Sequence, residues 1–507
     1  MGQSRDVTKS AVPRAYDLIV TVLDDGSFVS WDEPIAVPAD VDPGYAADLE
    51  RARVRTGTDE AVRTGRGTIQ GLPVAVIVSE FGFLGGSVGV ACANRIETAI
   101  RRATAERLPL IAAPASGGTR MQEGTIAFLQ MARITAAIGD HKKAGLVYLV
   151  YLRHPTTGGV FASWGSLGHV TVAAPGALIG FLGPRVFEAI NGEPFPAGVQ
   201  LAENLAQHGI IDAVVPTEAL GDVAARTLRI LTSTPDPVAR PAEAVPTRRA
   251  AADPVWDSVL TTRDPERFGI RQLLRSGATE VIPLSGTAEG EQQRGVLTAF
   301  ARIGGVSCVL AGHDRVAQRE YGAIGPAALR RVRRCIRLAA ELRLPLVTII
   351  DTPGASMSRE AEEGGLSSEI ARCLADLMTL ESPIATVLLG EGAGGGALAL
   401  LPADRILAAE HAWLAPLPPE GASAILNHGD VSFAPALAEA QGIAARRLAE
   451  EGVVDVLVPE NGDPHAFAAT LAYEIAMALT AAAAEPAAVR LRQRSDRFRR
   501  GGSSYRT

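Results

Sequence analysis

The stretches ATAERLPLIAAPASGGTRMQEG at residues 103–124 and AAELRLPLVTIIDTPGASMSREAEEGG at residues 339–365 decide the fold, because the second repeats the first in outline. Pro109 aligns with Pro345 at an offset of 236 residues. The same offset relates further glycines, pairing Gly89 with Gly325, Gly118 with Gly354, and Gly159 with Gly395. Matched glycines and prolines at a constant offset indicate an internal duplication, rather than two α/β segments that share only their composition.

Each repeat alternates short apolar runs with helical patterns. In the first repeat, apolar runs bounded by Gly, Pro or Ser are typical of buried strands and cover residues 73–80, 108–115 and 146–152. Between them, apolar residues recur at helical spacing over residues 90–107 and 125–144. In the second repeat, the expected strands are 306–312, 344–351 and 384–390, and the expected helices are 326–342 and 366–380. This rhythm predicts an α/β fold in both halves.

The length and the linker composition predict two domains. A chain of 507 residues exceeds what one hydrophobic core usually organises. Residues 232–254 are rich in Pro and Ala and lack apolar periodicity, which is typical of a linker. We therefore expect an N-terminal domain at residues 1–235, a linker at 236–255, and a C-terminal domain at 256–507.

Charge and cysteine content argue against several classes of protein. The formal net charge of −7 does not suit a nucleic-acid binder. Four widely spaced cysteines form no zinc-ligand pattern, so we expect no metal site. The N-terminus lacks an apolar core of signal-peptide length, and no apolar run reaches the ~20 residues that span a membrane. We expect a cytoplasmic protein that spans no membrane.

Glycines gather where strands pass into helices in both halves. Backbone N–H groups at such junctions face outward, and two loops that converge can hold a carbonyl oxygen as it becomes an oxyanion. One such loop is by itself an ordinary tight turn, but four loops in duplicated order favour a site. The predicted catalytic positions are Gly118, Gly159, Gly354, Gly395 and Gly396, and the predicted cofactor-binding positions are Gly117, Gly158 and Gly394.

Two long motifs carry a family resemblance. SGGTRMQEG at 116–124, with GGVFASWGSLGHVTVAAPGALIGFLGPRV at 158–186, resembles the β-type subunit of bacterial acetyl-CoA carboxylase carboxyltransferase. DTPGASMSREAEEGG at 351–365, with the segment 390–426, resembles the α-type subunit. The resemblance covers residues 24–459 and implies two tandem crotonase-like domains of the ββα-superhelix type, fused as in actinobacterial acyl-CoA carboxylases. It also implies active sites where a β-type half faces an α-type half.

The same resemblance implies the reaction and the partners. The expected reaction transfers a carboxyl group from carboxybiotin on a separate carrier protein to acetyl-CoA or another short acyl-CoA, which forms malonyl-CoA or a homologue for fatty-acid or related synthesis. The chain has no biotinylation motif and no ATP-binding loop, so the biotin carrier and the biotin carboxylase are expected as separate partners. The family also implies a homo-oligomer, either a dimer or a trimer of dimers.

Two departures from the family pattern stand out. The separate β-type subunit has an N-terminal four-cysteine zinc ribbon, whereas no cysteine precedes Cys92 here, and the metal is expected to be absent. After DTPGA the family continues with a Tyr-Pro-Gly type of sequence, whereas this chain has Ser-Met-Ser-Arg at 356–359. The second departure bears on how the second site fits its substrate.

Several charged side chains and one histidine near these motifs are secondary candidates. We interpret Arg120 and Glu123 as a structural ion pair and Glu420 as a carboxylate at a helix N-terminus. His154 is interpreted as a turn histidine, with donation to an intermediate as the alternative. The remaining charges are interpreted as solvated, and they are Arg101, Arg102, Lys142, Lys143 and the arginine run of the C-terminal tail. The alternatives are contact with the CoA phosphates for the first four and contact with a partner or a phosphate for the arginine run.

Three other functions share parts of this pattern. A crotonase-type hydratase or isomerase would use carboxylates to move protons and water. A biotin-dependent decarboxylase subunit would run the same transfer in reverse. A noncatalytic scaffold of a carboxylase complex would bind no acyl-CoA.

Overall fold

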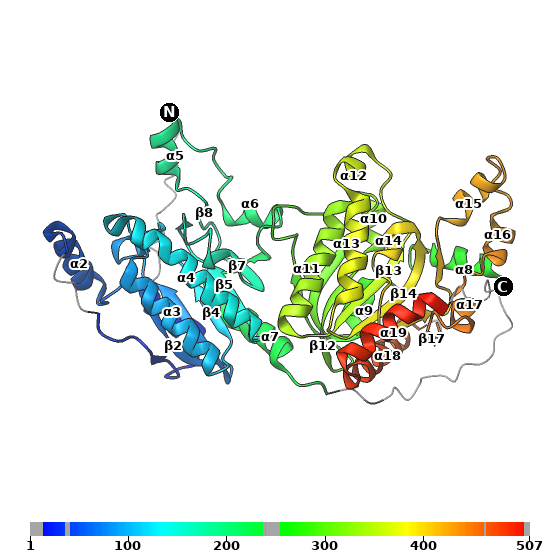
Figure 1. Cartoon of the computed structure of the whole chain (residues 1–507), viewed down its shortest axis with the longest axis horizontal. Coiled ribbons are helices and arrows are strands. Elements are labelled where there is room, and N and C mark those ends of the chain that lie inside the picture. The colour runs from blue at the N-terminus through cyan, green and yellow to red at the C-terminus, as the bar shows by residue number, and fades with distance from the viewer. Residues whose placement is uncertain (1–13, 36–40, 237–238, 240–253, 461–462, 501–507) are drawn as a thin grey trace. The chain divides into compact units, whose positions relative to one another are not determined.

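The chain folds into two compact units (Figure 1). The computed structural model describes residues 14–35, 41–236, 239, 254–460 and 463–500. Contacts divide the chain into Met1–Leu228 and Arg229–Thr507, and the division falls inside helix α7 (Thr217–Thr232). Most of the predicted linker lies outside the described residues, so the domain boundaries at 235 and 256 stay a prediction.

The first unit is built on a seven-stranded sheet. Its order is β1 (Val29–Ser30), β2 (Val62–Ile69), β3 (Leu72–Ser79), β4 (Leu110–Ala113), β5 (Tyr148–Leu152), β7 (Val170–Ala173) and β9 (Ala213–Val214). The strands β1 to β3 pair antiparallel, and the remaining strands pair parallel. A separate parallel pair joins β6 (Thr156–Thr157) to β8 (Ile179–Gly180).

The second unit repeats this topology. Its main path is β10 (Ala278–Leu284), β11 (Val296–Ile303), β12 (Val306–His313), β13 (Leu346–Thr352), β14 (Ile384–Ala393), β15 (Arg405–Ala409) and β17 (Val456–Val458), and β16 (Trp413–Ala415) pairs with β14. Again the first three strands are antiparallel and the rest are parallel. The duplication and the α/β class predicted from the sequence are confirmed.

Helices cover the sheets where apolar periodicity predicted them. In the first unit α3 (Val90–Ala105) packs on β2, β3 and α4 (Gly124–Lys143). Their counterparts are α11 (Pro326–Leu342) and α13 (Leu366–Thr379). The other helices of the first unit are α1 (Ala15–Val22), α2 (Pro43–Thr56), α5 (Pro184–Asn191) and α6 (Ala202–Gln207), with 3-10 turns at Leu84–Gly86, Met121–Glu123 and Trp164–Ser166.

The second unit contains further helices besides α11 and α13. They are α8 (Val255–Thr262), α9 (Ile270–Ser276), α10 (Arg315–Tyr321), α12 (Arg359–Glu363), α14 (Gly394–Leu398), α15 (Pro419–Leu426), α16 (Ala434–Ala440), α17 (Ala445–Glu450), α18 (Pro464–Ala484) and α19 (Ala487–Arg500). Helix α18 is long and apolar enough to cross a membrane. It instead packs on α9 and several strands, and it buries Phe467, Leu471, Ile475 and Leu479, as a core helix does.

Part of the C-terminal arginine run is buried rather than solvated. Helix α19 turns Arg490 and Arg494 inward, where they are 7% and 1% exposed. Arg494 donates to Asp404 Oδ1 at 2.7 Å and to the carbonyl of Leu380, just beyond the end of α13, at 2.9 Å. The sequence interpretation was wrong here, because arginine runs also occur where guanidinium groups satisfy the unpaired carbonyls at helix ends. Residues 501–507 of the same run lie outside the described residues.

Candidate functional site

In the first unit, the loops that follow β4 and β5 meet. A β-carbon built on Gly118 would lie 3.4 Å from the α-carbon of Gly158 and 3.5 Å from the amide nitrogen of Gly159. Backbone bonds hold the loops together, since Thr157 N donates to Ser116 O at 2.9 Å. Gly118 has φ of 110°, a conformation that favours glycine. The structure thus brings Gly117, Gly118, Gly158 and Gly159 together, as the sequence predicted.

Some of these amides are engaged within the protein. Gly117 N donates to Gly85 O at 2.9 Å, and Gly158 N donates to Phe181 O at 2.9 Å. Gly118 N donates to the hydroxyl of Ser116 at 3.0 Å. These three amides therefore serve to build the loops.

Two other amides in the same loops are open. Within the described chain, the N–H groups of Gly159 and Thr119 have no hydrogen-bond partner. A β-carbon on Gly159 would lie 3.3 Å from Thr119 Oγ1 and 3.3 Å from Met131 Cγ, so Gly159 closely faces Thr119. Two open amides in adjoining loops can both donate to a planar carbonyl oxygen that gains negative charge.

A cavity of about 830 Å³ opens on these loops. Its lining includes Gly85, Ser87, Gly117, Thr119, His154 and Thr157. Among the described lining residues there is no Asp, Glu, Lys or Arg. Its described lining therefore offers amides, hydroxyls and one imidazole, and no carboxylate to act as a base.

The second unit repeats the arrangement 236 residues later. A β-carbon on Gly396 would lie 3.3 Å from the amide nitrogen of Ala355, and one on Gly354 would lie 4.0 Å from Ala393 O. Gly354 has φ of 135° and donates its N–H to the hydroxyl of Thr352 at 3.2 Å. Gly354 thus matches Gly118, and Thr352 matches Ser116.

The open amides of the second unit also correspond to those of the first. Among the residues that the structure describes, the N–H groups of Ala355, Gly395 and Gly396 have no partner. Gly395 and Gly396 lie in the first turn of α14, where a helix leaves its first amides unpaired. Ala355 corresponds to Thr119, and Gly395 corresponds to Gly159.

The sequence prediction missed Thr119 and Ala355. Each lies one residue after a predicted glycine, and the signal was the hydroxyl residue two positions before that glycine. A serine or threonine hydroxyl commonly binds the amide two residues on. Ser116 and Thr352 bind the glycine amides in this way, and the open donor is then the next residue in each loop.

A buried ionic network lies beneath the second loop pair. Asp351 is 1% exposed and accepts a hydrogen bond from the amide of Glu391 at 3.2 Å. Arg315 Nε lies 3.8 Å from its other oxygen. Burial raises the pKa of Asp351 to about 6, against the opposing effect of Arg315. Asp351 thereby links the ends of β13 and β14, from which both loops leave.

The carboxylates that a hydratase would need are engaged elsewhere. Arg120 is buried and pairs with Glu60, and Glu123 accepts from Val90 N at 2.6 Å at the start of α3. Glu420 lies in the first turn of α15 and pairs with Arg263 at 2.5 Å. The structural interpretation of these side chains is confirmed.

Arg101 and Arg102 are exposed and pair with Glu97 and Glu106 along α3.

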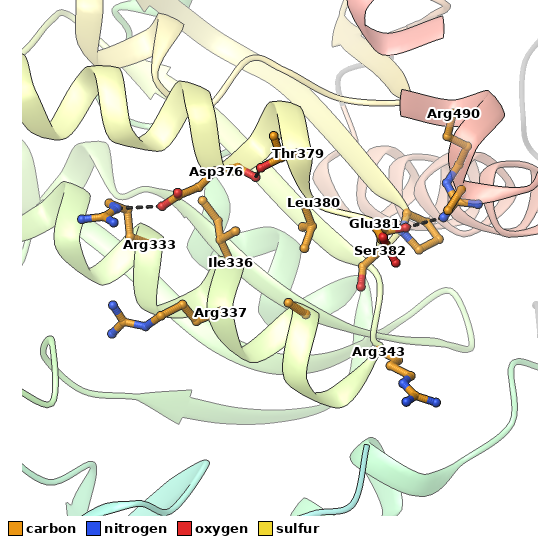
Figure 2. A pocket seen from close by; sticks show the side chains of 13 residues that line it. Arg333, Ile336, Arg337, Arg343, Asp376, Thr379, Leu380, Glu381, Ser382 and Arg490 are labelled. Carbon is orange, nitrogen blue, oxygen red and sulfur yellow. Dashed lines mark hydrogen bonds and ion pairs between the residues drawn. The ribbon is translucent and has the colours of Figure 1, made fainter. Parts of the chain in front are cut away.

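An arginine-lined cavity of about 660 Å³ lies elsewhere in the second unit (Figure 2). Its lining residues Ser382 and Pro383 precede β14, so it lies at the opposite ends of the strands from the glycine loops. Arg333 pairs with Asp376 at 2.7 Å, and Arg490 donates to Glu381 O. These guanidinium groups serve the packing of α11, α13 and α19.

The described chain offers no cluster of three or more His, Cys, Asp or Glu side chains that would hold a metal ion. All four cysteines are buried, and they form no disulfide bond with one another.

Comparison with known proteins identifies the family. Residues 17–495 match the carboxyl transferase domain. The chain is 56% identical over 486 residues to a probable biotin-dependent acyl-coenzyme A carboxylase beta3 subunit of Mycobacterium tuberculosis, covering 95% of this chain and 97% of that protein. It is 37% identical over 515 residues to the acetyl-coenzyme A carboxylase carboxyl transferase subunits beta/alpha of Salinispora arenicola, covering 96% and 90%.

A solved structure shares the fold. The transcarboxylase 12S hexamer, crystallised with methylmalonyl-coenzyme A and methylmalonic acid, superposes with a TM-score of 0.74 at 22% identity, covering 94% of this chain and 90% of that one. The crotonase-like fold expected from the sequence is thereby confirmed. The chain belongs to the carboxyl transferase domain family, among the carboxyltransferase subunits of biotin-dependent acyl-CoA carboxylases.

Proposed function

We propose that this chain transfers a carboxyl group from carboxybiotin, carried on a separate protein, to acetyl-CoA or another short acyl-CoA, which yields malonyl-CoA or a homologue. The observation that carries the proposal is the pair of matched amide sets, Thr119 with Gly159 and Ala355 with Gly395 and Gly396. The reaction has two carbonyl oxygens to stabilise, and the chain has two sets of open donors. We assign residues 1–235 as the β-type half and 256–507 as the α-type half.

Bound carboxybiotin would supply the carboxyl group. The role of the chain is to hold each oxygen while it is negative, through N–H groups that the loops already orient. Each fixed donor of this kind is worth about 2.7–4 kcal/mol of barrier reduction in other enzymes. The lining of the first cavity contains no carboxylate base among its described residues, which supports transfer of the α-proton of the thioester to a group that the substrates bring.

The contacts of Glu123 and Glu420 disfavour a hydratase or isomerase. Both carboxylates are committed to structural partners, Val90 N for Glu123 and Arg263 for Glu420. A hydratase would leave a carboxylate facing the cavity. The decarboxylase direction uses the same donors, and the experiment below separates it from carboxylation.

Large apolar side chains lie exposed beside both amide sets, which supports assembly with further copies of this chain. Met121 is 83% exposed at the first cavity, and Met357 is 98% exposed two residues after Ala355. Exposed apolar side chains near a site are typical of surfaces that a partner covers. We propose a homo-oligomer, a dimer or a trimer of dimers, that works in the cytoplasm with a biotin carrier and a biotin carboxylase.

The experiment reconstitutes the purified chain with a biotin carboxylase and a biotin carrier. Bicarbonate fixation is measured as kcat/KM for acetyl-, propionyl- and butyryl-CoA. The proposal expects fixation with at least one of the three and a preference among them, since one methylene changes binding by about 1–3 kcal/mol. Decarboxylation of malonyl-CoA with free biotin, without any measurable fixation, would favour the decarboxylase. Absence of both acyl-CoA binding and turnover would favour the scaffold.

A further inference from the structure

His154 lies in the wall of the first cavity, together with Gly117, Thr119 and Thr157. His154 is only partly exposed, and its Nδ1 accepts a hydrogen bond from Leu178 N at 3.1 Å. Leu178 O in turn accepts from Thr156 N at 2.9 Å. The imidazole thus extends the short β6–β8 pairing by one bond, and this bond fixes the plane of the ring.

The bond to Leu178 determines which ring nitrogen carries the proton. A backbone N–H donates to Nδ1, so Nδ1 is unprotonated and the proton of the neutral ring is on Nε2. Partial burial lowers the pKa of His154, which favours this neutral form at neutral pH. Within the described chain, Nε2 has no hydrogen-bond partner.

Two of the hydroxyls that line the cavity with His154 are already used. Ser87 donates its hydroxyl proton to Leu84 O at 2.8 Å, and Thr157 donates to Ser116 O at 3.5 Å. The oriented N–H of His154 is therefore available to a molecule in the cavity.

The second half has no equivalent of this donor. The position that corresponds to His154 is Gly390, 236 residues later. A β-carbon on Gly390 would lie 2.3 Å from Asp351 Oδ1, so no side chain fits there. The two halves are matched in their backbone amides but differ in this side chain.

We propose that His154 is a substrate-binding residue, whose Nε2–H donates a hydrogen bond to an oxygen of the molecule held at the Thr119 and Gly159 amides. The inference rests on the proposed function. It adds that the first half holds its substrate with a side-chain donor that the second half lacks. The oxygen belongs either to the acyl thioester or to biotin, since both present a carbonyl to this cavity.

Two substitutions separate the binding role from a merely structural one. Asn places an oxygen near the position of Nδ1, so H154N keeps the acceptor for Leu178 N and loses the donor. Gln places an amide N–H₂ near the position of Nε2, so H154Q keeps the donor and loses the acceptor. The control is H208N, because His208 is exposed at the end of α6 and, within the described chain, its side chain hydrogen-bonds only to its own helix, at Asn204 O.

The proposal expects H154N to lower kcat/KM by about 10- to 100-fold, the range of a hydrogen bond to an acceptor that becomes charged, and H154Q to recover most of that loss. H208N should match the wild type. The reverse order, with H154N active and H154Q impaired, would overturn the proposal and leave His154 as a structural turn residue. Thermal unfolding of each variant checks that both fold.

Two further readouts identify the substrate and the protonation state. Titration calorimetry with acetyl-CoA and with biotin shows which ligand H154N binds more weakly, and it does not depend on turnover. Equal binding of both ligands by all variants would contradict the proposal even if the chain proved inactive.

The second readout is the pH profile of kcat/KM. For the wild type, kcat/KM should fall as His154 protonates at acidic pH, since an imidazolium cannot accept the hydrogen bond from Leu178 N. H154Q should lack this limb; an identical limb in H154Q would also contradict the proposal.

Discussion

Ser116 and Thr352 set the geometry of the two loops at the scale of single residues. Each hydroxyl accepts the amide of a glycine at positive φ two residues later, Gly118 or Gly354. The amide that follows, of Thr119 or Ala355, is left open. The chemistry of each loop therefore depends on a side chain that never needs to touch a substrate.

Replacing Ser116 with alanine tests this dependence. Gly118 is buried, and without the hydroxyl its N–H has no partner, which costs about 1–3 kcal/mol of unfolding free energy. The loop also loses its fixed geometry, so kcat should fall about tenfold or more. Chemical denaturation and steady-state turnover measure the two effects. S166A is the control, because the hydroxyl of Ser166 makes an exposed bond, to Phe161 O. Equal values for S116A and S166A would show that the Ser116 hydroxyl does not hold the loop.

Asp351 makes stability depend on pH in a defined direction. Its folded-state pKa of about 6 lies above the ordinary 3.8, so the folded state holds the proton more tightly than the unfolded state does. The unfolding free energy contributed by this group therefore falls as pH rises from about 4 to about 6, by about 3 kcal/mol in all.

The variant D351N removes this titration and keeps an acceptor for Glu391 N. Denaturation of the wild type and of D351N is measured between pH 4.5 and 7. As pH rises over this range, the unfolding free energy of D351N should increase relative to that of the wild type. A constant difference across this range would mean that Asp351 is ionised throughout.

At the scale of elements, α19 shows how a charged segment is held in the fold. Arg494 is 1% exposed and serves both Asp404 and the carbonyl of Leu380. The run of arginines in the sequence does not reveal these contacts, because the carbonyls that it satisfies belong to a distant part of the chain. Helices α3 and α11, in contrast, were predicted to within two residues, since apolar spacing along the chain is enough to define them.

The substitution R494M should lower the unfolding free energy by about 3–5 kcal/mol, because it leaves Asp404 buried without its main partner. The matched substitution R499M affects a guanidinium that is 77% exposed and should change stability by less than about 0.5 kcal/mol. Thermal and urea unfolding compare the two. If R494M proves as stable as R499M, α19 does not dock through this residue.

At the scale of the whole molecule, the duplication explains both the success and the limits of sequence prediction. The constant offset predicted two similar units, the strand and helix order within each, and the glycine loops. It did not predict which amides are open, because this depends on hydroxyl contacts such as Ser116 with Gly118. Nor did it predict that His154 has a glycine as its counterpart in a crowded position, since the crowding comes from Asp351 in a neighbouring strand.

The most direct test of the account measures carboxyl transfer by G159V and G395V. A valine side chain at Gly159 would start 3.3 Å from Thr119 Oγ1, and one at Gly395 would start 2.8 Å from Ile370 Cδ1, so each fills the space beside an open amide. The control is G139V in α4, where a β-carbon meets nothing within 4 Å. We predict that either loop variant folds and loses about 100-fold or more in kcat, while G139V keeps wild-type turnover. Near wild-type transfer by folded G159V or G395V would contradict the claim that backbone amides perform the chemistry.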